Sequence, residues 1–204
     1  MRKIHHDNTY HGHTMCNSGK LNDGCYEEIL ERAKTLLNYM IQRHSRVFFT
    51  VFVLHYPEYS ASQYPVDNGL LSMFLEAFTL YCSRHGYPTK YLWVRERSME
   101  TGQFHYHLML LYEYDAIRNT HTLLEKANDL WRSYLNMEGF GRFVHSCPWQ
   151  TSFDQLGGVK IMRNDPQFPQ AYDRCFQQAS YLAKCYSKGD LPPYVKGYDS
   201  SRLN

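Results

Sequence analysis

The strongest constraint on the fold is the run from Val47 to Leu54, in which every residue before the last is β-branched or aromatic. These residue types favour extended backbone, and a run without polar alternation is typical of a strand buried in the middle of a sheet. Pro57 follows and stops the strand, because proline has no backbone N–H to donate. We therefore predict a buried central strand at residues 47–54.

Other segments show the periodicity of further elements. Apolar residues at helical spacing predict helices at residues 24–44, 67–85, 120–137 and 169–188, the first of them capped by Asn22 or Asp23. Strands are expected at residues 90–96 and 104–112, joined by a turn at 98–103, and again at 142–145 and 158–162. This ferredoxin-like β-α-β-β-α-β order predicts an α+β fold, with an antiparallel sheet and helices on one face.

The length of 204 residues suits one substantial domain and is too short for two ordinary ones. Residues 1–20 are polar and rich in histidine, and we expect them to form an arm in front of a single domain at residues 21–204. No stretch approaches the ~18–20 apolar residues of a membrane span, and the first residues lack the apolar core of a signal peptide. We therefore expect a folded protein without membrane contact, which stays in the cytoplasm of the cell that makes it.

The chain has 22 Lys and Arg and 20 Asp and Glu, which gives a net charge of only +2. This balance excludes non-specific electrostatic binding to duplex DNA through an overall basic surface. The 18 Tyr, 11 Phe and 3 Trp indicate that any contact with nucleic acid is local and assisted by stacking on unpaired bases. The six cysteines include no Cys-x-x-Cys pair, which argues against a disulfide framework and against a four-cysteine zinc site.

A candidate metal site comes from the predicted hairpin. His105 and His107 flank Tyr106 in an apolar strand, so both imidazoles point to the same face. Glu96 ends the preceding strand, and a tight turn would bring it beside them. One carboxylate and two imidazoles can hold Mg²⁺, Mn²⁺ or Zn²⁺ and leave positions open for water and substrate. The alternative interpretation is a pair of structural histidines and a glutamate at a solvated strand end.

A candidate nucleophile lies near the end of the last predicted helix. At ~100° per residue, Tyr181, Lys184 and Lys188 share one face, with Gln177 one turn earlier, whereas Tyr186 points about 140° away from Tyr181. A phenol beside two ammonium groups suits attack on a phosphodiester, because the cations favour the phenolate and hold the phosphate. Alone, this pattern is also typical of an ordinary amphipathic helix.

The order of these features along the chain resembles the HUH endonucleases, which initiate rolling-circle replication. The strand at residues 49–54 resembles motif I of viral and plasmid Rep proteins, residues 95–107 look like motif II, and residues 181–184 look like motif III. Three stretches are similar more narrowly to inovirus-type replication proteins of filamentous phages and prophages: Tyr91–Glu96, Ser180–Lys184 and Ser200–Arg202. The likeness covers about residues 45–202.

The resemblance implies a sheet of about five antiparallel strands with the metal site on its face and the tyrosine helix alongside. It implies that Glu96, His105 and His107 bind the metal, Mg²⁺ or Mn²⁺, and that Tyr181 attacks a DNA phosphate with Lys184 as its electrostatic partner. The products would be a 5′-phosphotyrosine link and a free 3′-OH that primes synthesis.

The chain departs from some two-tyrosine initiators, which carry Tyr-x-x-Lys-Tyr. Cys185 here displaces Tyr186 by one position, which favours a single-tyrosine mechanism. Tyr186, Lys188 and Gln177 are therefore secondary candidates.

The expected function is nicking and joining of single-stranded DNA or an origin hairpin of a phage, prophage or plasmid. No ATP-binding Gly-x-x-x-x-Gly-Lys-Ser/Thr string is present, so a host helicase and polymerase are the expected partners, in a bacterial cytoplasm. The alternatives are a relaxase or transposase of the same superfamily and a non-catalytic, metal-stabilised DNA-binding protein of the phage repressor type. The sequence does not fix the origin, the native metal, the oligomeric state, the part played by Tyr186 or the role of the histidine-rich segment.

Overall fold

A computed structural model describes most of the chain, namely residues 2–16, 24–57, 64, 67–116, 120–139, 141–147, 157–189 and 191–203. The predicted central strand is confirmed as β5 (Arg46–His55), whose eight inner residues are all buried. It pairs along its length with β7 (Phe104–Glu113), and β7 pairs with β6 (Thr89–Arg97) to form the predicted hairpin. The cap residues Asn22 and Asp23 lie outside the described residues.

The main sheet has the order β10-β6-β7-β5-β8, and β9 (Val159–Met162) also pairs with β5. Every pairing in it is antiparallel. The chain runs β5, α2 (Gly69–Arg84), β6, β7, α3 (His121–Tyr134), β8 (Val144–Ser146), which is the predicted β-α-β-β-α-β order. One edge strand was not predicted: β10 (Tyr198–Ser200) pairs with the outer side of β6.

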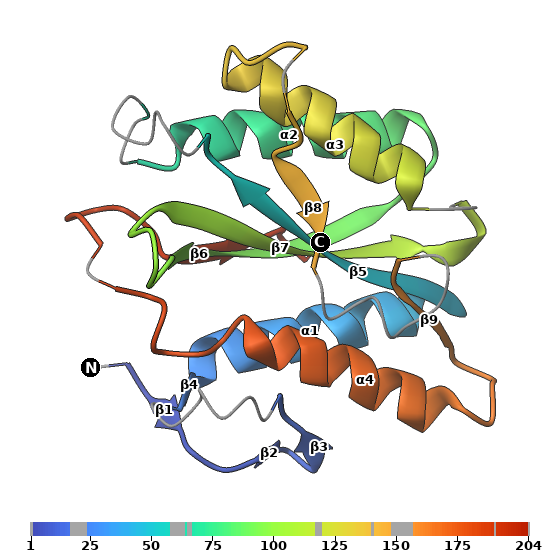
Figure 1. Ribbon diagram of the computed structural model, residues 1–204. Helices are drawn as coiled ribbons and strands as arrows, with labels where there is room; N and C mark the ends of the chain where they lie inside the picture. The colour runs from blue at the N-terminus through green and yellow to red at the C-terminus, as the bar shows by residue number, and fades with distance from the viewer. Residues whose placement is uncertain are drawn as a thin grey trace.

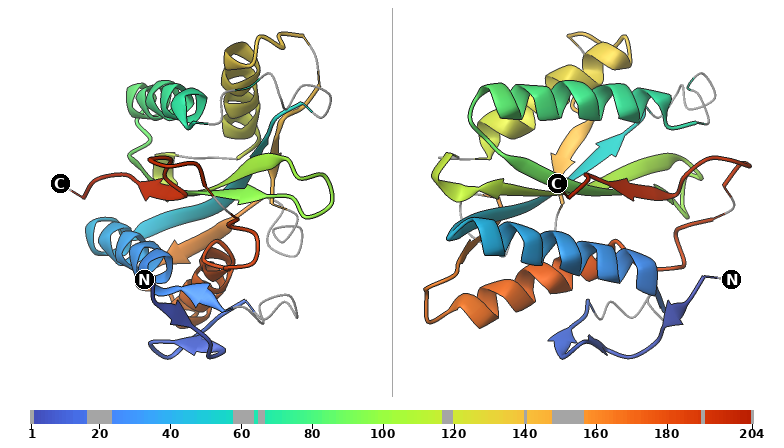
Figure 2. Two further views of the ribbon diagram at one scale, coloured as in Figure 1. Left: turned by 90° about the vertical axis from the view of Figure 1, so that its left-hand side faces the viewer. Right: turned by 180° about the vertical axis from the view of Figure 1, so that it is seen from behind.

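Helices cover both faces of the sheet, so the prediction of helices on one face was wrong (Figures 1 and 2). One face carries α1 (Glu27–Arg43) and α4 (Phe168–Tyr181), and the other carries α2 (Gly69–Arg84) and α3 (His121–Tyr134). The reason lies in β5, which is apolar on both of its sides. Its side chains alternate between two cores, with Phe49, Val51 and Val53 in one and Phe48, Phe52 and Leu54 in the other.

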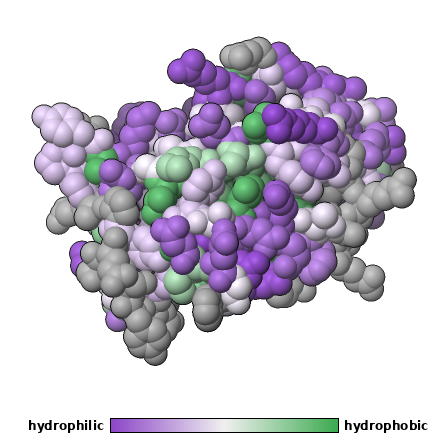
Figure 3. Space-filling model, turned by 90° about the horizontal axis from the view of Figure 1, so that it is seen from above, coloured by the Kyte–Doolittle hydropathy of each residue, from purple (hydrophilic) through white to green (hydrophobic). Residues whose placement is uncertain are grey.

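The outer surface above α2 and α3 is mostly hydrophilic, with small apolar areas between the polar side chains (Figure 3). Met73 and Leu80 on α2 are about half exposed. Within the described part of the chain, no helix has both the length and the apolar character needed to cross a membrane.

The last helix ends at Tyr181, earlier than the predicted end at residue 188. Beyond it the chain turns through hydrogen bonds of the i→i−3 type, the last from the Lys184 N–H to the Tyr181 carbonyl. It then pairs with the segment before α1. Lys184 and Cys25 form an isolated antiparallel β-bridge, and the Cys185 N–H donates a hydrogen bond to the Gly24 carbonyl. These contacts replace helical ones, so the angle that placed Tyr186 about 140° from Tyr181 does not apply.

The histidine-rich segment packs against the domain over its described residues 2–16, instead of projecting from it as an arm. β1 (Ile4–His5) pairs with β4 (Cys25–Tyr26), and β2 (Thr9–Tyr10) pairs with β3 (His13–Thr14). Tyr10 and Met15 are buried in the core beside α4. An ion pair between His13 Nδ1 and Asp173 Oδ1, at 2.6 Å, joins the segment to that helix. The segment is mostly polar but contains a few apolar residues, and burial of these residues explains why it packs against the domain.

We expect Met15→Ala to lower the free energy of unfolding by roughly 2–5 kcal/mol, because Met15 is 3% exposed and its loss leaves a cavity. Ile4→Ala, at a side chain that is 40% exposed, is the matched control and should cost less than about 1 kcal/mol. Urea unfolding of the two variants measures both. Equal effects would show that the segment does not pack as described.

Candidate metal centre

The hairpin of β6 and β7 brings the predicted donors together. Glu96 lies directly opposite His105, and His107 follows two residues later on the same face. Tyr106, between them, points into the core under α2 and α3. Glu96 Oε2 is 3.8 Å from His105 Nε2 and 3.5 Å from His107 Nε2. All three donor atoms lie within 4.8 Å of one another.

These distances suit a shared divalent ion. Two ligands at ~2.1 Å from a tetrahedral metal are ~3.4 Å apart, close to the separations between Glu96 and the two imidazoles. His107 is nearly buried, and its Nδ1 has no hydrogen-bond partner in the described structure. The nitrogen that faces Glu96 is Nε2, so Nε2 is the atom of His107 that would coordinate the ion. Glu96, His105 and His107 could therefore hold a metal ion.

Glu96 is not at a solvated strand end, since it is only 1% exposed. Lys184 Nζ is 2.8 Å from its Oε2, and Lys188 Nζ is 3.2 Å from its Oε1. Burial alone would raise the pKa of Glu96, but Lys188, His107 and Lys184 outweigh it and hold the pKa well below its usual range. Burial lowers the pKa of Lys188, and Glu96 opposes that shift.

The formal charges around Glu96 leave the centre positive. One carboxylate faces two lysines whose side chains are 2% and 3% exposed. A divalent cation would add further positive charge to this buried cluster. Such a site favours an anion, and a phosphate group is the anion that two ammonium groups and a divalent ion commonly share. The electrostatics therefore point to phosphate chemistry.

The two candidate tyrosines lie side by side at the end of α4. Lys184 Nζ sits 3.4 Å from the centre of the Tyr181 ring and 5.2 Å from that of Tyr186. The Tyr181 ring also contacts His107, with ring centres 5.9 Å apart. Burial raises the pKa of Tyr181, and a hydrogen bond with Tyr186 partly offsets that rise. Burial is also the main cause of the raised pKa of Tyr186, and its hydrogen bond with Tyr181 adds to that rise.

The remaining sequence candidates fall in different places. Lys188 Nζ donates a hydrogen bond to Glu96 Oε1, as described above. Gln177 lines a small cavity of about 50 Å³ together with Tyr181, Val51 and Cys147, and none of the three metal donors lines it. It is therefore a neighbour of the tyrosine and does not contact the metal donors.

Two histidines near the centre were missed by the sequence analysis. His55 ends β5 directly opposite His105, and their rings stack with centres 5.4 Å apart. His145 on β8 lies 5.7 Å from His55 between ring centres. Partial burial, His105 and His145 together lower the pKa of His55 to about 4. The position of His55 at the end of the central strand was the available signal, but its partner strand was unknown from sequence.

A family model described as the YagK/YfjJ C-terminal domain matches residues 6–194, which include the metal donors, both tyrosines and both lysines. No curated protein and no solved structure matches the chain.

The centre should make folding sensitive to acid. Burial lowers the pKa of His107 to about 3 from an ordinary value of 6.5, so between these values the unfolded chain binds a proton that the folded protein does not. Stability therefore falls as the pH falls through this window, by up to about 1.4 kcal/mol per pH unit for this one group. In urea titrations without metal between about pH 5 and 6, we expect His107→Gln to show a slope shallower by about one proton. An unchanged slope would contradict a neutral, buried His107.

The buried charges should be strongly coupled. Glu96→Gln leaves two buried ammonium groups without a carboxylate, and we expect it to cost roughly 3–5 kcal/mol of stability in metal-free buffer. Lys184→Met in the same chain removes one of those charges, so the double variant should be less destabilised than the sum of the two single changes. Additive effects would show that the ion pair seen at 2.8 Å contributes nothing.

Proposed function

This chain belongs to the YagK/YfjJ C-terminal domain family, and we propose that it is a metal-dependent endonuclease that nicks single-stranded DNA through a covalent tyrosine link. One observation carries the proposal. The Tyr181 ring lies against both His107 and Lys184, while Lys184 contacts the carboxylate that faces both histidines. A phenol, a buried cation and a metal-binding donor set meet at one point, which is what transfer of a phosphodiester to tyrosine requires.

The step is a transfer that conserves the phosphodiester. The Tyr181 oxygen attacks phosphorus, an O–P bond forms, and the bond from phosphorus to the 3′ oxygen breaks. The phenolic proton leaves to solvent, and the 3′ oxygen takes a proton from water. A divalent ion held by Glu96, His105 and His107 would polarise the phosphate when bound.

The other side chains of the centre favour this step by electrostatics. Lys184 and Lys188 place positive charge where negative charge develops on the phosphate. Tyr186 shares a hydrogen bond with Tyr181, which helps to hold the attacking phenol in place. Tyr186 thus acts as a positioning residue, and the single-tyrosine mechanism does not require it to form a covalent link.

The fold supports the finer assignment to the HUH superfamily. The donors lie on β6 and β7 of an antiparallel sheet, and Tyr181, at the end of α4, contacts His107. Figure 1 shows α4 against one face of that sheet. We propose that the biological reaction is origin nicking for rolling-circle replication of a phage, prophage or plasmid. The free 3′-OH would prime a host polymerase, and strand separation would fall to a host helicase.

A non-catalytic role is the second candidate, and one observation favours it. Both oxygens of Glu96 are already paired with lysines, as in a structural ion-pair network. In a metal-stabilised DNA-binding protein of the repressor type, DNA binding would be the whole function. Removal of the Tyr181 hydroxyl would then change nothing that can be measured on DNA.

Covalent adduct formation separates the two candidates. We expect the protein, incubated with Mn²⁺ and a randomised single-stranded DNA pool, to give a denaturation-resistant protein–DNA band on a gel. Tyr181→Phe should abolish the band, because the nucleophile is lost, and should keep stability and DNA binding, because the ring remains. His105→Ala and His107→Ala should each abolish it as well.

Tyr186→Phe is the matched control for the adjacent phenol. We expect it to form the adduct on Tyr181 but several-fold more slowly, because the nucleophile remains while its hydrogen-bond partner is lost. Mass spectrometry of the linked peptide identifies the residue. Phosphate on Tyr186 would overturn the assignment of Tyr181. If Tyr181→Phe and the double variant His105→Ala and His107→Ala each formed a normal adduct, the whole mechanism would be overturned.

A further inference from the structure

A cavity of about 490 Å³ adjoins the metal donors at the end of β5 and β7. His105 is both a metal donor and a lining residue of the cavity, so the cavity lies directly beside the centre. Its volume falls within the ~300–1,000 Å³ of typical small-molecule sites. The proposed mechanism above uses His105 only as a metal donor and gives the rest of this cavity no role.

The lining of the cavity suits a nucleotide. Aromatic rings come from Tyr56, Phe104 and Phe143, and the cation comes from Arg142. Ser98, Thr101 and Gln103 supply polar side chains from the hairpin turn. Among the described lining residues there is no carboxylate. Rings stack on bases, and arginine binds phosphate, so a nucleotide fits this chemistry.

A second large cavity, of about 600 Å³ beside α2, provides the contrast. Asp67, Glu76 and Asp199 line it, whereas no described lining residue of the first cavity carries a carboxylate. That electrostatic environment disfavours a nucleic acid backbone. The fully exposed Tyr194 at its rim makes a useful control position.

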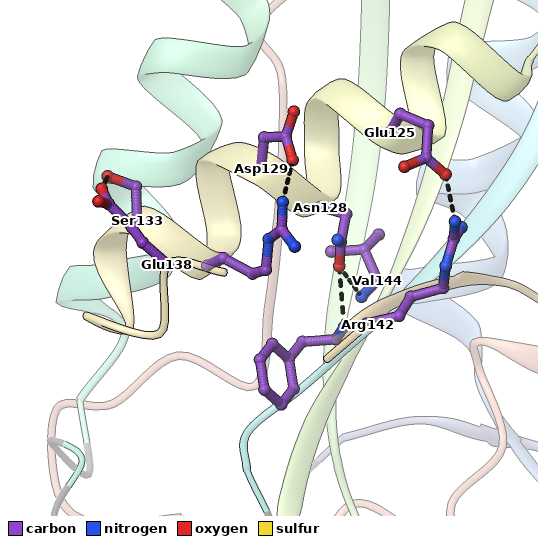
Figure 4. Close-up of polar contacts among 9 residues, drawn as sticks. Glu125, Asn128, Asp129, Ser133, Glu138, Arg142 and Val144 are labelled. Atoms are coloured by element: carbon purple, nitrogen blue, oxygen red, sulfur yellow. Dashed lines mark hydrogen bonds and ion pairs between the residues drawn. The ribbon is translucent and has the colours of Figure 1, made fainter. Parts of the chain in front are cut away.

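The wall that carries Phe143 and Arg142 is held in place by α3. Asn128 is 2% exposed, and its Oδ1 accepts hydrogen bonds from the N–H groups of Phe143 and Val144, at 2.8 and 3.1 Å. Glu125, one turn earlier, forms an ion pair with Arg142 (Figure 4). These contacts fix the positions of Phe143 and Arg142 before a ligand binds, which lowers the entropy cost of binding.

The cavity and the tyrosine adjoin different ends of the histidine pair, the cavity at His105 and the tyrosine at His107. The cavity includes His55 and His105, at the end of the two paired strands. Tyr181 contacts His107 and shares its own small cavity with Val51, four residues back along β5 from His55. A phosphate bound at the donors would therefore have the phenol on one side and the large cavity on the other.

We infer that this cavity binds the nucleotide that ends in the 3′-OH after nicking, with its base against Phe143 and its backbone near Arg142. The inference rests on the proposed function. In an in-line displacement the attacking and leaving oxygens lie on opposite sides of phosphorus. With Tyr181 on one side, the departing 3′ oxygen and its nucleotide are directed into the cavity.

The test measures binding of the 3′-OH product without requiring the reaction. The probe is a short oligothymidylate whose last nucleotide is 2-aminopurine with a free 3′-OH, and a matched probe carries 2-aminopurine at the 5′ end. The protein is Tyr181→Phe with Mn²⁺. We expect the protein to quench the 3′-terminal probe by stacking, and to quench the 5′-terminal probe much less.

Two variants and a control locate the stacking. Phe143→Leu keeps apolar volume but removes the ring, and should weaken binding of the 3′-terminal probe roughly tenfold. Arg142→Gln, at an exposed side chain whose change leaves the core untouched, should weaken it several-fold. Tyr194→Leu removes an aromatic ring from the other cavity and should bind as the parent does.

The outcomes distinguish the cavity from the reaction. Equal quenching of the two probes, or a loss with Tyr194→Leu but not with Phe143→Leu and Arg142→Gln, would overturn the inference. If the expected pattern appears but the unmodified chain forms no covalent adduct, the cavity binds 3′ ends and the proposed nicking fails. If adduct forms but the 3′-terminal probe is not quenched, nicking stands and the cavity assignment is wrong.

Discussion

The structure of the centre depends on one buried carboxylate. Glu96 faces two histidines on β7 and contacts two lysines from the chain that follows α4. Because an unpaired buried charge costs several kcal/mol, these lysines must lie at Glu96 in the folded protein. That requirement, together with the pairing of Lys184 and Cys25, explains why α4 stops at Tyr181. The hairpin thus positions the donors, and the two ion pairs with Glu96 hold the lysines, and with them the tyrosine, beside those donors.

The same contact gives the centre its chemical character. Two buried ammonium groups around one carboxylate make a positive site that also carries metal donors. A cation and a phosphate anion can neutralise each other there, so each should bind more tightly in the presence of the other, as linkage requires. Coupled binding of this kind would accord with the proposed role in phosphate transfer.

Much of this arrangement could be predicted from sequence, since the central strand and the hairpin follow from local patterns. A short hairpin fixes its own register, which is why Glu96, His105 and His107 could be placed together. Features set by distant contacts were missed. The end of α4 depends on Glu96, and the proximity of His55 to His145 depends on how β8 pairs with β5. Helices on both faces could have been inferred, because the central strand has no polar side.

The most direct test of the central claim is pulsed electron paramagnetic resonance of Mn²⁺ bound to the Tyr181→Phe protein together with single-stranded DNA. If Glu96, His105 and His107 hold the ion, the spectrum shows coupling to ¹⁴N from two imidazoles and to ³¹P from the DNA. The ¹⁴N coupling disappears in the double variant His105→Ala and His107→Ala. Mn²⁺ that shows ³¹P coupling but no ¹⁴N coupling in the Tyr181→Phe protein would contradict the account.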